Sequence, residues 1–219
     1  MEHKLITLAD QVMERIEKDI LSGKYQKGEL LNELRISEDL NVSRTPVREA
    51  LKRLLQEHLL EETAKGLKVV GITREDMLDF YRIRSFVEPM AAERCAKNIS
   101  EEALAEIREA IDMQEYYLDK QEKENADYSE KIKDCDSLFH ELIYKNCGSN
   151  ALMDTLLPIH KKMTKYRKAS VRSNSRAKES IAEHNEIYQA LVLRDETAVA
   201  AVMRKHIANA EAHVAVTEV

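Results

Sequence analysis

The segment from Asn41 to Leu54 carries an apolar face and a basic face at helical spacing. Val47, Ala50, Leu51 and Leu54 recur every three or four residues, so they lie on one side of a helix. The arginine and lysine side chains fall on another side. Such a helix packs on a core through its apolar face and leaves its basic face for an anionic partner. The segment therefore predicts a helix that enters a groove of DNA.

The basic residues gather near the start of this predicted helix. Proline is accepted only in a first turn, which fits Pro46, and the hydroxyls of Ser43 and Thr45 both stand where an N-cap would lie. Helix-turn-helix proteins present this end of their second helix to base edges, where arginine suits guanine and threonine suits a thymine methyl. Arg44, Thr45 and Arg48 meet this requirement. The alternative is an ordinary amphipathic helix with a solvated basic face, and the neighbouring sequence decides between them.

The composition favours a mainly α-helical chain of two domains. Its 219 residues exceed the usual size of one domain, which is roughly 150 residues. Only 5 glycines and 3 prolines occur, and 43% hydrophobic residues are ample for a core. The pattern changes near Thr73, so we expect one domain over residues 1–73 and another over residues 74–219.

The charge distribution limits the size of any DNA-binding surface. Residues 1–73 contain 12 basic and 13 acidic residues, and the remainder contains 22 and 27, within a net charge of -6. Between Asn41 and Leu54, however, four basic residues oppose Glu49 alone. DNA affinity must therefore come from a small basic footprint, and we expect a homodimer that doubles it on a palindromic operator.

The cysteines and the hydropathy indicate a cytoplasmic protein. Cys95, Cys135 and Cys147 are odd in number and lack C-x-x-C spacing, and the N-terminus shows no signal segment. No apolar run approaches the ~20 residues that cross a bilayer. We therefore expect reduced thiols and no membrane span.

The sequence around the basic helix predicts a helix-turn-helix with a wing. A first helix has apolar residues every fourth position from Leu8 to Ile20, and it ends near Ser22–Gly23. A loop with a short extended piece spans Tyr25–Leu31, and a brief helix spans Leu34–Asn41. After the basic helix, Leu59–Thr63 and Leu67–Val70 read as two strands joined by a turn at Ala64-Lys65-Gly66.

This arrangement resembles the winged helix-turn-helix of the GntR family of bacterial transcription regulators. The resemblance is carried by Leu21-Ser22-Gly23-Lys24-Tyr25, Gly28-Glu29-Leu30-Leu31-Asn32-Glu33, Val42-Ser43-Arg44-Thr45-Pro46-Val47-Arg48-Glu49-Ala50-Leu51, and Gly66. It implies double-stranded DNA as the partner. It also implies that the DNA contacts fall on Arg44, Thr45, Arg48, Lys65 and Gly66. One departure is Leu34, which stands where some members carry a DNA-contacting arginine.

The remainder of the chain reads as an all-α bundle. Thr73 with Asp76, and Ser100 with Glu101, resemble helix N-termini. We expect six helices, or seven if Pro158 breaks one of them. Their expected ranges are 73–97, 100–123, 129–146, 150–171, 177–193 and 196–216.

Four residues of this bundle have metal-binding chemistry. Asp136 and His140 are four residues apart, so they project from one face of a helix. His184 and His206 lie near the middle of two later helices, flanked by apolar residues at helical spacing. One carboxylate and three imidazoles can then converge in the core, where bundles build such sites. Each residue alone is more often a core or surface group, and His3, His58, His160 and His213 are interpreted as structural or surface residues.

The C-terminal half resembles the FCD ligand-binding domain of FadR-type GntR regulators. The motifs are Asp136-x-x-Phe139-His140, Gly148-Ser149-Asn150, Glu183-His184-x-x-Ile187-x-x-Ala190-Leu191 and Met203-x-x-His206. The resemblance implies a divalent ion on Asp136, His140, His184 and His206, with a small carboxylate effector completing its coordination. It also aligns Arg84 with a pocket arginine, whose guanidinium suits an effector carboxylate.

Asp and three His ligands suit Zn(II), and equally Ni(II), Mn(II) or Fe(II). The chain is therefore interpreted as a transcription regulator with a metal-dependent effector domain. One rival is a metal-dependent enzyme that acts on a small carboxylate, since an open site can activate water. That reading leaves the segment Val42–Leu51 unexplained. A third reading is a purely structural metal.

Overall fold

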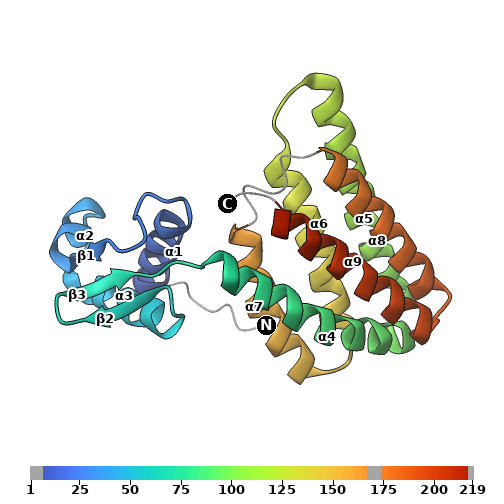
Figure 1. Cartoon of the computed structure of the whole chain (residues 1–219), viewed down its shortest axis with the longest axis horizontal. Helices are drawn as coiled ribbons and strands as arrows, with labels where there is room; N and C mark the ends of the chain where they lie inside the picture. Colours follow the sequence, from blue (N-terminus) through green and yellow to red (C-terminus); the bar gives the residue numbers. More distant parts are fainter. Residues whose placement is uncertain (1–6, 167–173, 217–219) are drawn as a thin grey trace. The chain divides into compact units, whose positions relative to one another are not determined.

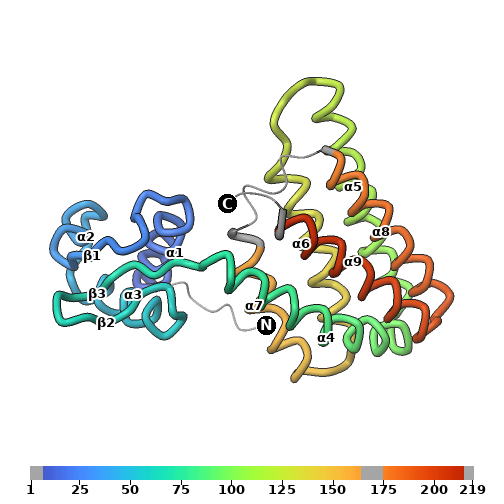
Figure 2. Tube along the Cα trace, viewed as in Figure 1, coloured from blue at the N-terminus to red at the C-terminus, as the bar shows by residue number. Residues whose placement is uncertain are grey.

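The computed structural model describes residues 7–166 and 174–216 (Figure 1). Within it the chain divides into two compact units, Met1–Thr73 and Arg74–Val219. The trace in Figure 2 shows a small mixed unit followed by a larger helical one. The fold is mainly α, as the sequence predicts.

The N-terminal unit contains helices α1 (Leu8–Leu21), α2 (Glu33–Asp39) and α3 (Arg44–Gln56). Helix α1 begins with a capping box, in which Thr7 Oγ1 accepts a hydrogen bond from Asp10 N and Asp10 accepts one from Thr7 N. It ends before Gly23, whose φ of 77° is a left-handed conformation that favours glycine. Ser43 is the N-cap of α3, although its side chain makes no capping hydrogen bond.

Three short strands form the wing of this unit. Strands β1 (Leu30–Leu31), β2 (Leu60–Thr63) and β3 (Gly66–Val69) form an antiparallel sheet in the order β1-β3-β2. The sequence predicts β2 and β3 as a hairpin but only a short extended piece where β1 lies. Leu30 pairs with Lys68 and Leu31 with Leu67. The third strand depends on a partner far along the chain, which local pattern does not reveal.

The apolar faces of the helices and the wing share one core. Val47, Ala50, Leu51 and Leu54 of α3 are at most 1% exposed. They pack with apolar residues of α1, α2 and the strands. Burying one face of α3 in this way fixes the opposite face toward solvent. The other core residues are Val12, Ile16, Ile20, Ile36, Leu59, Leu60 and Val69.

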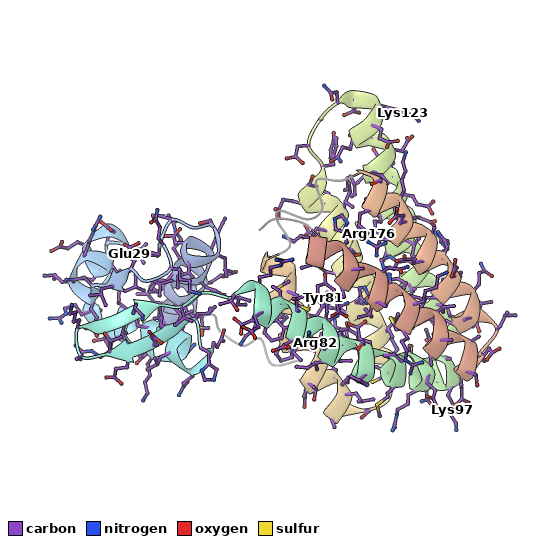
Figure 3. All side chains as sticks on the ribbon, viewed as in Figure 1. Glu29, Tyr81, Arg82, Lys97, Lys123 and Arg176 are labelled. Carbon is purple, nitrogen blue, oxygen red and sulfur yellow. The ribbon has the colours of Figure 1, made fainter. Side chains whose placement is uncertain are left out.

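Six helices make up the described part of the C-terminal unit. Helix α4 packs extensively along α9, and α5 along α6 (Figure 1). Figure 3 shows the side chains of the unit, with Lys97 and Lys123 at its periphery. The helices are α4 (Arg74–Asn98), α5 (Glu101–Glu124), α6 (Ser129–Asn146), α7 (Asn150–Tyr166), α8 (Asn174–Val192) and α9 (Glu196–Val216).

These bounds agree closely with the expected ranges. Helix α7 continues through Pro158, and α4 through Pro89, so the described residues contain no seventh helix in this unit. The expected extension of α7 over residues 167–171 lies outside the described residues. No helix in the described ranges combines the length and apolar character needed to cross a membrane.

Candidate metal centre and nucleic-acid interface

Three histidines from three helices converge in the core of the C-terminal unit. His140 lies on α6, His184 on α8 and His206 on α9, and their exposures are 0%, 0% and 2%. One ring nitrogen from each lies within 4.8 Å of the others. The sequence predicted this convergence from the position of each histidine on the inward face of its helix.

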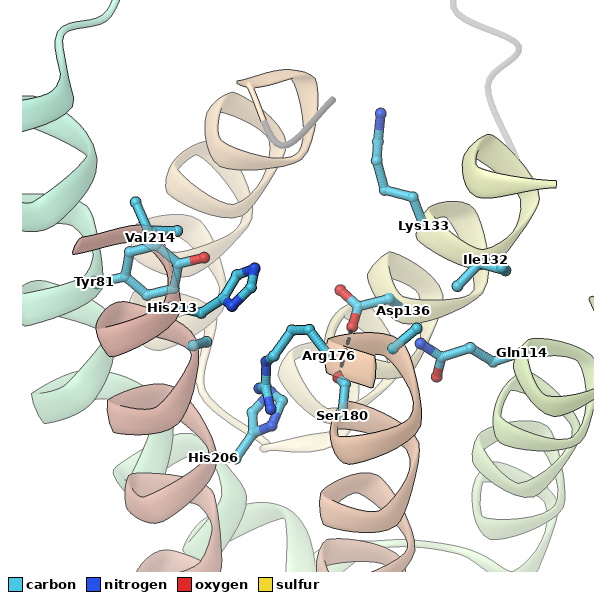
Figure 4. Close-up of a pocket in the computed structure, with 12 residues that line it drawn as sticks. Tyr81, Gln114, Ile132, Lys133, Asp136, Arg176, Ser180, His206, His213 and Val214 are labelled. Atoms are coloured by element: carbon cyan, nitrogen blue, oxygen red, sulfur yellow. Dashed lines mark hydrogen bonds between the residues drawn. The ribbon is translucent and has the colours of Figure 1, made fainter. Parts of the chain in front are cut away.

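The Nε2 atoms face the inside of this histidine cluster. His140 Nε2 lies 3.2 Å from His206 Nε2. Asp136 adjoins the cluster, since its Oδ1 lies 3.7 Å from His184 Nε2 and accepts a hydrogen bond from Ser180 Oγ at 3.3 Å. Figure 4 shows Asp136, Ser180 and His206 at the same cavity. All four predicted metal-binding residues are therefore brought together.

The Nδ1 atoms face away from the cluster toward oxygen acceptors. This arrangement favours a proton on Nδ1, which leaves the lone pair of Nε2 directed inward. The outer contacts are His184 Nδ1 to Gln114 Oε1 at 3.0 Å, His206 Nδ1 to Glu183 Oε2 at 2.7 Å, and His140 Nδ1 to Glu88 Oε2 at 3.3 Å.

The donor set fits a divalent cation. Two inward lone pairs at the separation of His140 and His206 repel each other unless a proton or a cation lies between them. A tetrahedral ion with Zn–N bonds of about 2.0 to 2.1 Å holds its nitrogen ligands about 3.3 to 3.4 Å apart. The 3.2 Å spacing of these two Nε2 atoms is close to that value. Imidazole nitrogens with a carboxylate are suitable for zinc and for other first-row ions.

A buried ion pair on α4 adjoins the cluster. Arg84 and Glu88 are both 0% exposed; Arg84 Nε pairs with Glu88 Oε1, which also accepts a hydrogen bond from Tyr144 Oη at 2.6 Å. Burial acts to lower the pKa of Arg84 and to raise that of Glu88. The attraction between the two groups outweighs burial, so the net pKa of Arg84 is raised and that of Glu88 is lowered. Both groups therefore remain charged.

Arg84 is linked to the histidine cluster through Glu88, which contacts His140. It does not line the cavity that lies beside the cluster. Its Nη1 lies 3.9 Å from Met163 Sδ, and its Nη2 has no hydrogen-bond partner among the described residues. The cavity beside the cluster has a volume of about 60 Å³, and Arg84 is not among the described residues of its wall. The polar side chains of that wall are Tyr81, Gln114, Lys133, Asp136, Arg176, Ser180, His206 and His213 (Figure 4).

Sequence reasoning missed two of the outer acceptors, Gln114 and Glu88, and the position of His160 beside the cluster. Gln114 and Glu88 lie on helices whose relation to the histidines only the packing reveals. His160 was interpreted as structural or surface, yet it is 1% exposed and its ring centroid lies 5.3 Å from that of His140. His160 has no partner at chelating spacing in the sequence, so no local signal identifies it.

Two titrating groups at the cluster have perturbed pKa values. Burial, and next the charge of Arg84, hold the pKa of His140 well below 6.5. Burial acts to raise the pKa of Glu183, but hydrogen bonds from His206, Arg176 and Asn209 outweigh it and lower the pKa to about 2. The folded protein thus keeps a neutral His140 beside a charged outer carboxylate.

The predicted DNA-contacting residues lie on an exposed face of the N-terminal unit. Arg44, Thr45 and Arg48 are exposed on the first turns of α3. Lys65 and Gly66 are exposed at the turn between β2 and β3, where Gly66 has a φ of 124°. The recognition-helix residues and the wing residues thus belong to one compact unit, as the resemblance implied.

Glu33 is a carboxylate on this face that sequence reasoning missed. It is the first residue of α2 and pairs with Arg44 and Arg48 of α3. Its Oε2 lies 3.3 Å from Arg44 Nη2 and 3.1 Å from Arg48 Nη2, and its Oε1 lies 3.3 Å from Arg48 Nε. The hydrogen bond from Arg48 is the largest cause that lowers the pKa of Glu33.

Comparison with known proteins identifies the family. Residues 8–66 match the model described as "Bacterial regulatory proteins, gntR family", and residues 79–209 match the model described as "FCD domain". The second match alone covers more than half of the chain. The protein belongs to the GntR family of bacterial transcription regulators and is of the FadR type, with an N-terminal winged helix-turn-helix and a C-terminal FCD domain.

Similar proteins are transcription regulators. The gluconate operon transcriptional repressor of Bacillus licheniformis is 25% identical over 176 residues, covering 77% of this chain and 69% of that protein. The HTH-type transcriptional repressor RspR of Escherichia coli (strain K12) is 26% identical over 198 residues, covering 90% of this chain and 84% of that protein. The solved structure of E. coli McbR/YncC shares the fold, with a TM-score of 0.74 at 22% identity. The match covers 96% of this chain and 98% of that one. The prediction of a DNA-binding regulator and not an enzyme is confirmed.

The low pKa of His140 predicts acid sensitivity of the metal-free protein. Below about pH 6.5 His140 becomes protonated in the unfolded chain but stays neutral in the folded chain. The free energy of unfolding should therefore fall as the pH drops, by up to about 1.4 kcal/mol per pH unit for this one group. Urea unfolding of chelated protein at several pH values measures this slope. His140→Gln should reduce the slope, whereas exposed His58→Asn should not, and equal slopes in all three proteins would contradict the assignment.

Proposed function

We propose that this regulator binds a divalent metal at His140, His184, His206 and Asp136, and that a small carboxylate bound there controls its affinity for DNA. The observation that carries the proposal is the orientation of the imidazoles. One ring nitrogen of each imidazole faces the others in a buried space. Gln114 Oε1 and Glu183 Oε2 lie at hydrogen-bond distance from Nδ1 of His184 and His206, and Glu88 Oε2 lies 3.3 Å from Nδ1 of His140. A merely hydrogen-bonded core histidine has no need of two such neighbours.

Zinc is the favoured ion, with nickel, manganese and iron as alternatives. Three neutral imidazoles and one carboxylate supply nitrogen and oxygen ligands that all four ions accept. A bound ion would act as a Lewis acid toward the effector carboxylate. The residues of the chain orient the ligands: Gln114 and Glu183 hold His184 and His206, and Ser180 holds Asp136.

The neighbouring cavity supports a small anionic effector. Its volume of about 60 Å³ provides room for a small molecule, and Lys133, Arg176 and His213 contribute basic groups to its wall. Arg84 does not line this cavity. It is proposed to receive an effector carboxylate on the side of the cluster next to Glu88, because its Nη2 is buried and has no hydrogen-bond partner in the described part of the chain. The Bacillus licheniformis relative is a repressor of the gluconate operon, and gluconate is itself a carboxylate.

The DNA contacts are proposed to come from Arg44, Thr45 and Arg48 on α3 and from Lys65 and Gly66 on the wing. All five residues are exposed, and α3 is held by its apolar face so that its basic face is exposed to solvent. The boundary after Thr73 then separates operator binding from effector binding. A protein that acts on chromosomal DNA would work in the cytoplasm.

Two substitutions test the DNA-binding face. Arg44→Ala and Arg48→Ala should each cost about 1 to 3 kcal/mol of binding to a selected operator, because each removes a base-reading guanidinium, with a smaller loss on random DNA. Gel shifts with a duplex selected from a randomised library provide the measurement. Exposed Arg74→Ala, outside the proposed face, is the control. Wild-type affinity in both α3 variants would remove this part of the proposal.

The regulator is proposed to be a homodimer on a palindromic operator. One winged unit with a small basic surface binds DNA weakly. In a dimer, binding of one unit to its half-site raises the effective concentration of the second unit at the other half-site. Helix α4 offers an apolar stripe for self-association, with Ile83, Phe86 and Met90 exposed by 40%, 75% and 54%. In water such a stripe favours burial against a second copy.

Sedimentation of the full chain tests this dimer. The wild type should sediment as a dimer at micromolar concentration, and Phe86→Glu should shift the equilibrium toward monomer because it places a charge in the apolar contact. Leu193→Glu is the matched control, since Leu193 is 76% exposed but does not lie on α4. A monomeric wild type with full affinity for a single half-site would contradict the proposal.

Metal and effector should act together on DNA binding. Chelation should lower the melting temperature, because an ion bound only to the folded state stabilises it by mass action. His184→Ala should do the same in the C-terminal unit. A carboxylate that binds the metal-loaded protein should shift operator affinity, and this coupling should vanish without metal.

Calorimetric titration of carboxylates, gluconate among them, into loaded, chelated and His184→Ala protein measures this coupling. Operator binding is followed in parallel. Equal carboxylate affinity in all three proteins would exclude the metal-dependent effector. Consumption of the carboxylate would support the rival enzyme, and tight metal binding with no effect of any acid would support a structural metal.

A further inference from the structure

A single carboxylate on α2 holds both arginines that begin the recognition helix. Glu33 receives hydrogen bonds from Arg44 at 3.3 Å and from Arg48 at 3.1 and 3.3 Å. The two arginines are one helical turn apart on α3, so their guanidinium groups meet at the same acceptor. Their side chains are 58% and 66% exposed, whereas that of Glu33 is 28% exposed.

The contact with Glu33 leaves part of Arg48 available. A guanidinium group has five N–H donors in a fixed planar fork. Arg48 uses Nε and one hydrogen of Nη2 on the carboxylate. Its outer edge, formed by Nη1 and the second hydrogen of Nη2, still presents two parallel donors. That edge is the one that suits bidentate contact with O6 and N7 of guanine.

The N-terminal turn of α2, which carries Glu33, is held in place by hydrogen bonds and packing. Glu33 follows Asn32, whose side chain accepts hydrogen bonds from the backbone N–H groups of Leu34 and Arg35 and so caps α2. Ile36 and Ser37 on the next turn are buried. A carboxylate at a helix N-terminus is also stabilised by the helix dipole. The lowered pKa of Glu33 keeps it charged at neutral pH.

We propose that Glu33 is a positioning residue that aims Arg44 and Arg48 at base edges and restrains them from phosphates. This inference rests on the proposed DNA-contacting role of the two arginines. The negative charge repels the phosphate backbone, which supplies most non-specific affinity. At the same time the two hydrogen bonds from Arg48 to Glu33 fix the orientation of the Arg48 guanidinium before DNA binds. Glu33 therefore raises the ratio of specific to non-specific binding at the expense of total affinity.

A merely structural ion pair predicts a different behaviour. Exposed ion pairs contribute little to stability. A structural role for Glu33 would therefore change only the melting temperature, and only slightly. A positioning role changes the sequence selectivity and the salt dependence of DNA binding while the fold stays intact. These two readouts separate the alternatives.

The experiment compares Glu33→Gln with Glu38→Gln in the full chain. Glu38 is an exposed glutamate on the same helix, and it contacts neither arginine in the part of the chain that the structure describes. The probes are a duplex selected from a randomised library by the wild type and a scrambled duplex of equal length. Affinity for both is measured by fluorescence anisotropy over a series of salt concentrations.

Glu33→Gln should bind the scrambled duplex more tightly, and its slope of log affinity against log salt should steepen by up to about 0.9, the value of one added phosphate contact. The ratio of specific to non-specific affinity should fall about fivefold. This factor corresponds to the smallest discrimination expected from one bidentate contact with guanine. Glu38→Gln should leave this ratio unchanged. In an Arg48→Ala background, Glu33→Gln should have a much smaller effect on it.

An unchanged ratio in Glu33→Gln, in a protein where Arg48→Ala does reduce specific binding, would overturn this inference and leave the proposed function standing. An equal fall in the ratio for Glu38→Gln would overturn it as well, because a general charge effect would then account for the result. Failure of both Arg44→Ala and Arg48→Ala to alter binding would instead overturn the proposed DNA-binding face, and this inference with it.

Discussion

Polar groups buried in an apolar core destabilise a protein unless each finds a partner, and the C-terminal unit is organised by this requirement. His140, His184 and His206 occupy the centre of the helical bundle, and their outer nitrogens each face an oxygen acceptor. Glu88 continues the chain of partners to Arg84 and Tyr144. Five of the helices thus contribute to one polar network, in which the proposed cation would satisfy the inner nitrogens.

The N-terminal unit follows the opposite principle. Its core is apolar, and its chemistry lies at the surface, where Arg44 and Arg48 meet Glu33. Exposed charges of this kind contribute little to stability. We propose that their arrangement affects which DNA is bound and how strongly salt weakens binding. The two units therefore separate a stabilising polar network from a recognition surface.

Helix α4 is relevant to both units because it begins at Arg74, directly after the last residue of the N-terminal unit. It also carries Arg84 and Glu88, which reach the histidine cluster through His140. The cluster is therefore in contact with the helix that is covalently joined to the DNA-binding unit. This connection gives a physical basis for linkage between an effector and operator affinity.

The sequence by itself determined the helices, the wing hairpin, the family and the inward positions of the four residues that are proposed to bind metal. These features depend on period and on short motifs, such as the apolar face of Val47 to Leu54 and the spacing of Asp136 and His140. Only the tertiary structure revealed β1 as a third strand, Gln114 and His160 beside the histidines, and Glu33 between two arginines. Those contacts join residues far apart in the chain, and side-chain direction at such distances is decided by packing and not by local pattern. Arg84 illustrates the limit, because the family resemblance singled it out in the sequence but did not reveal its link to the cluster through Glu88.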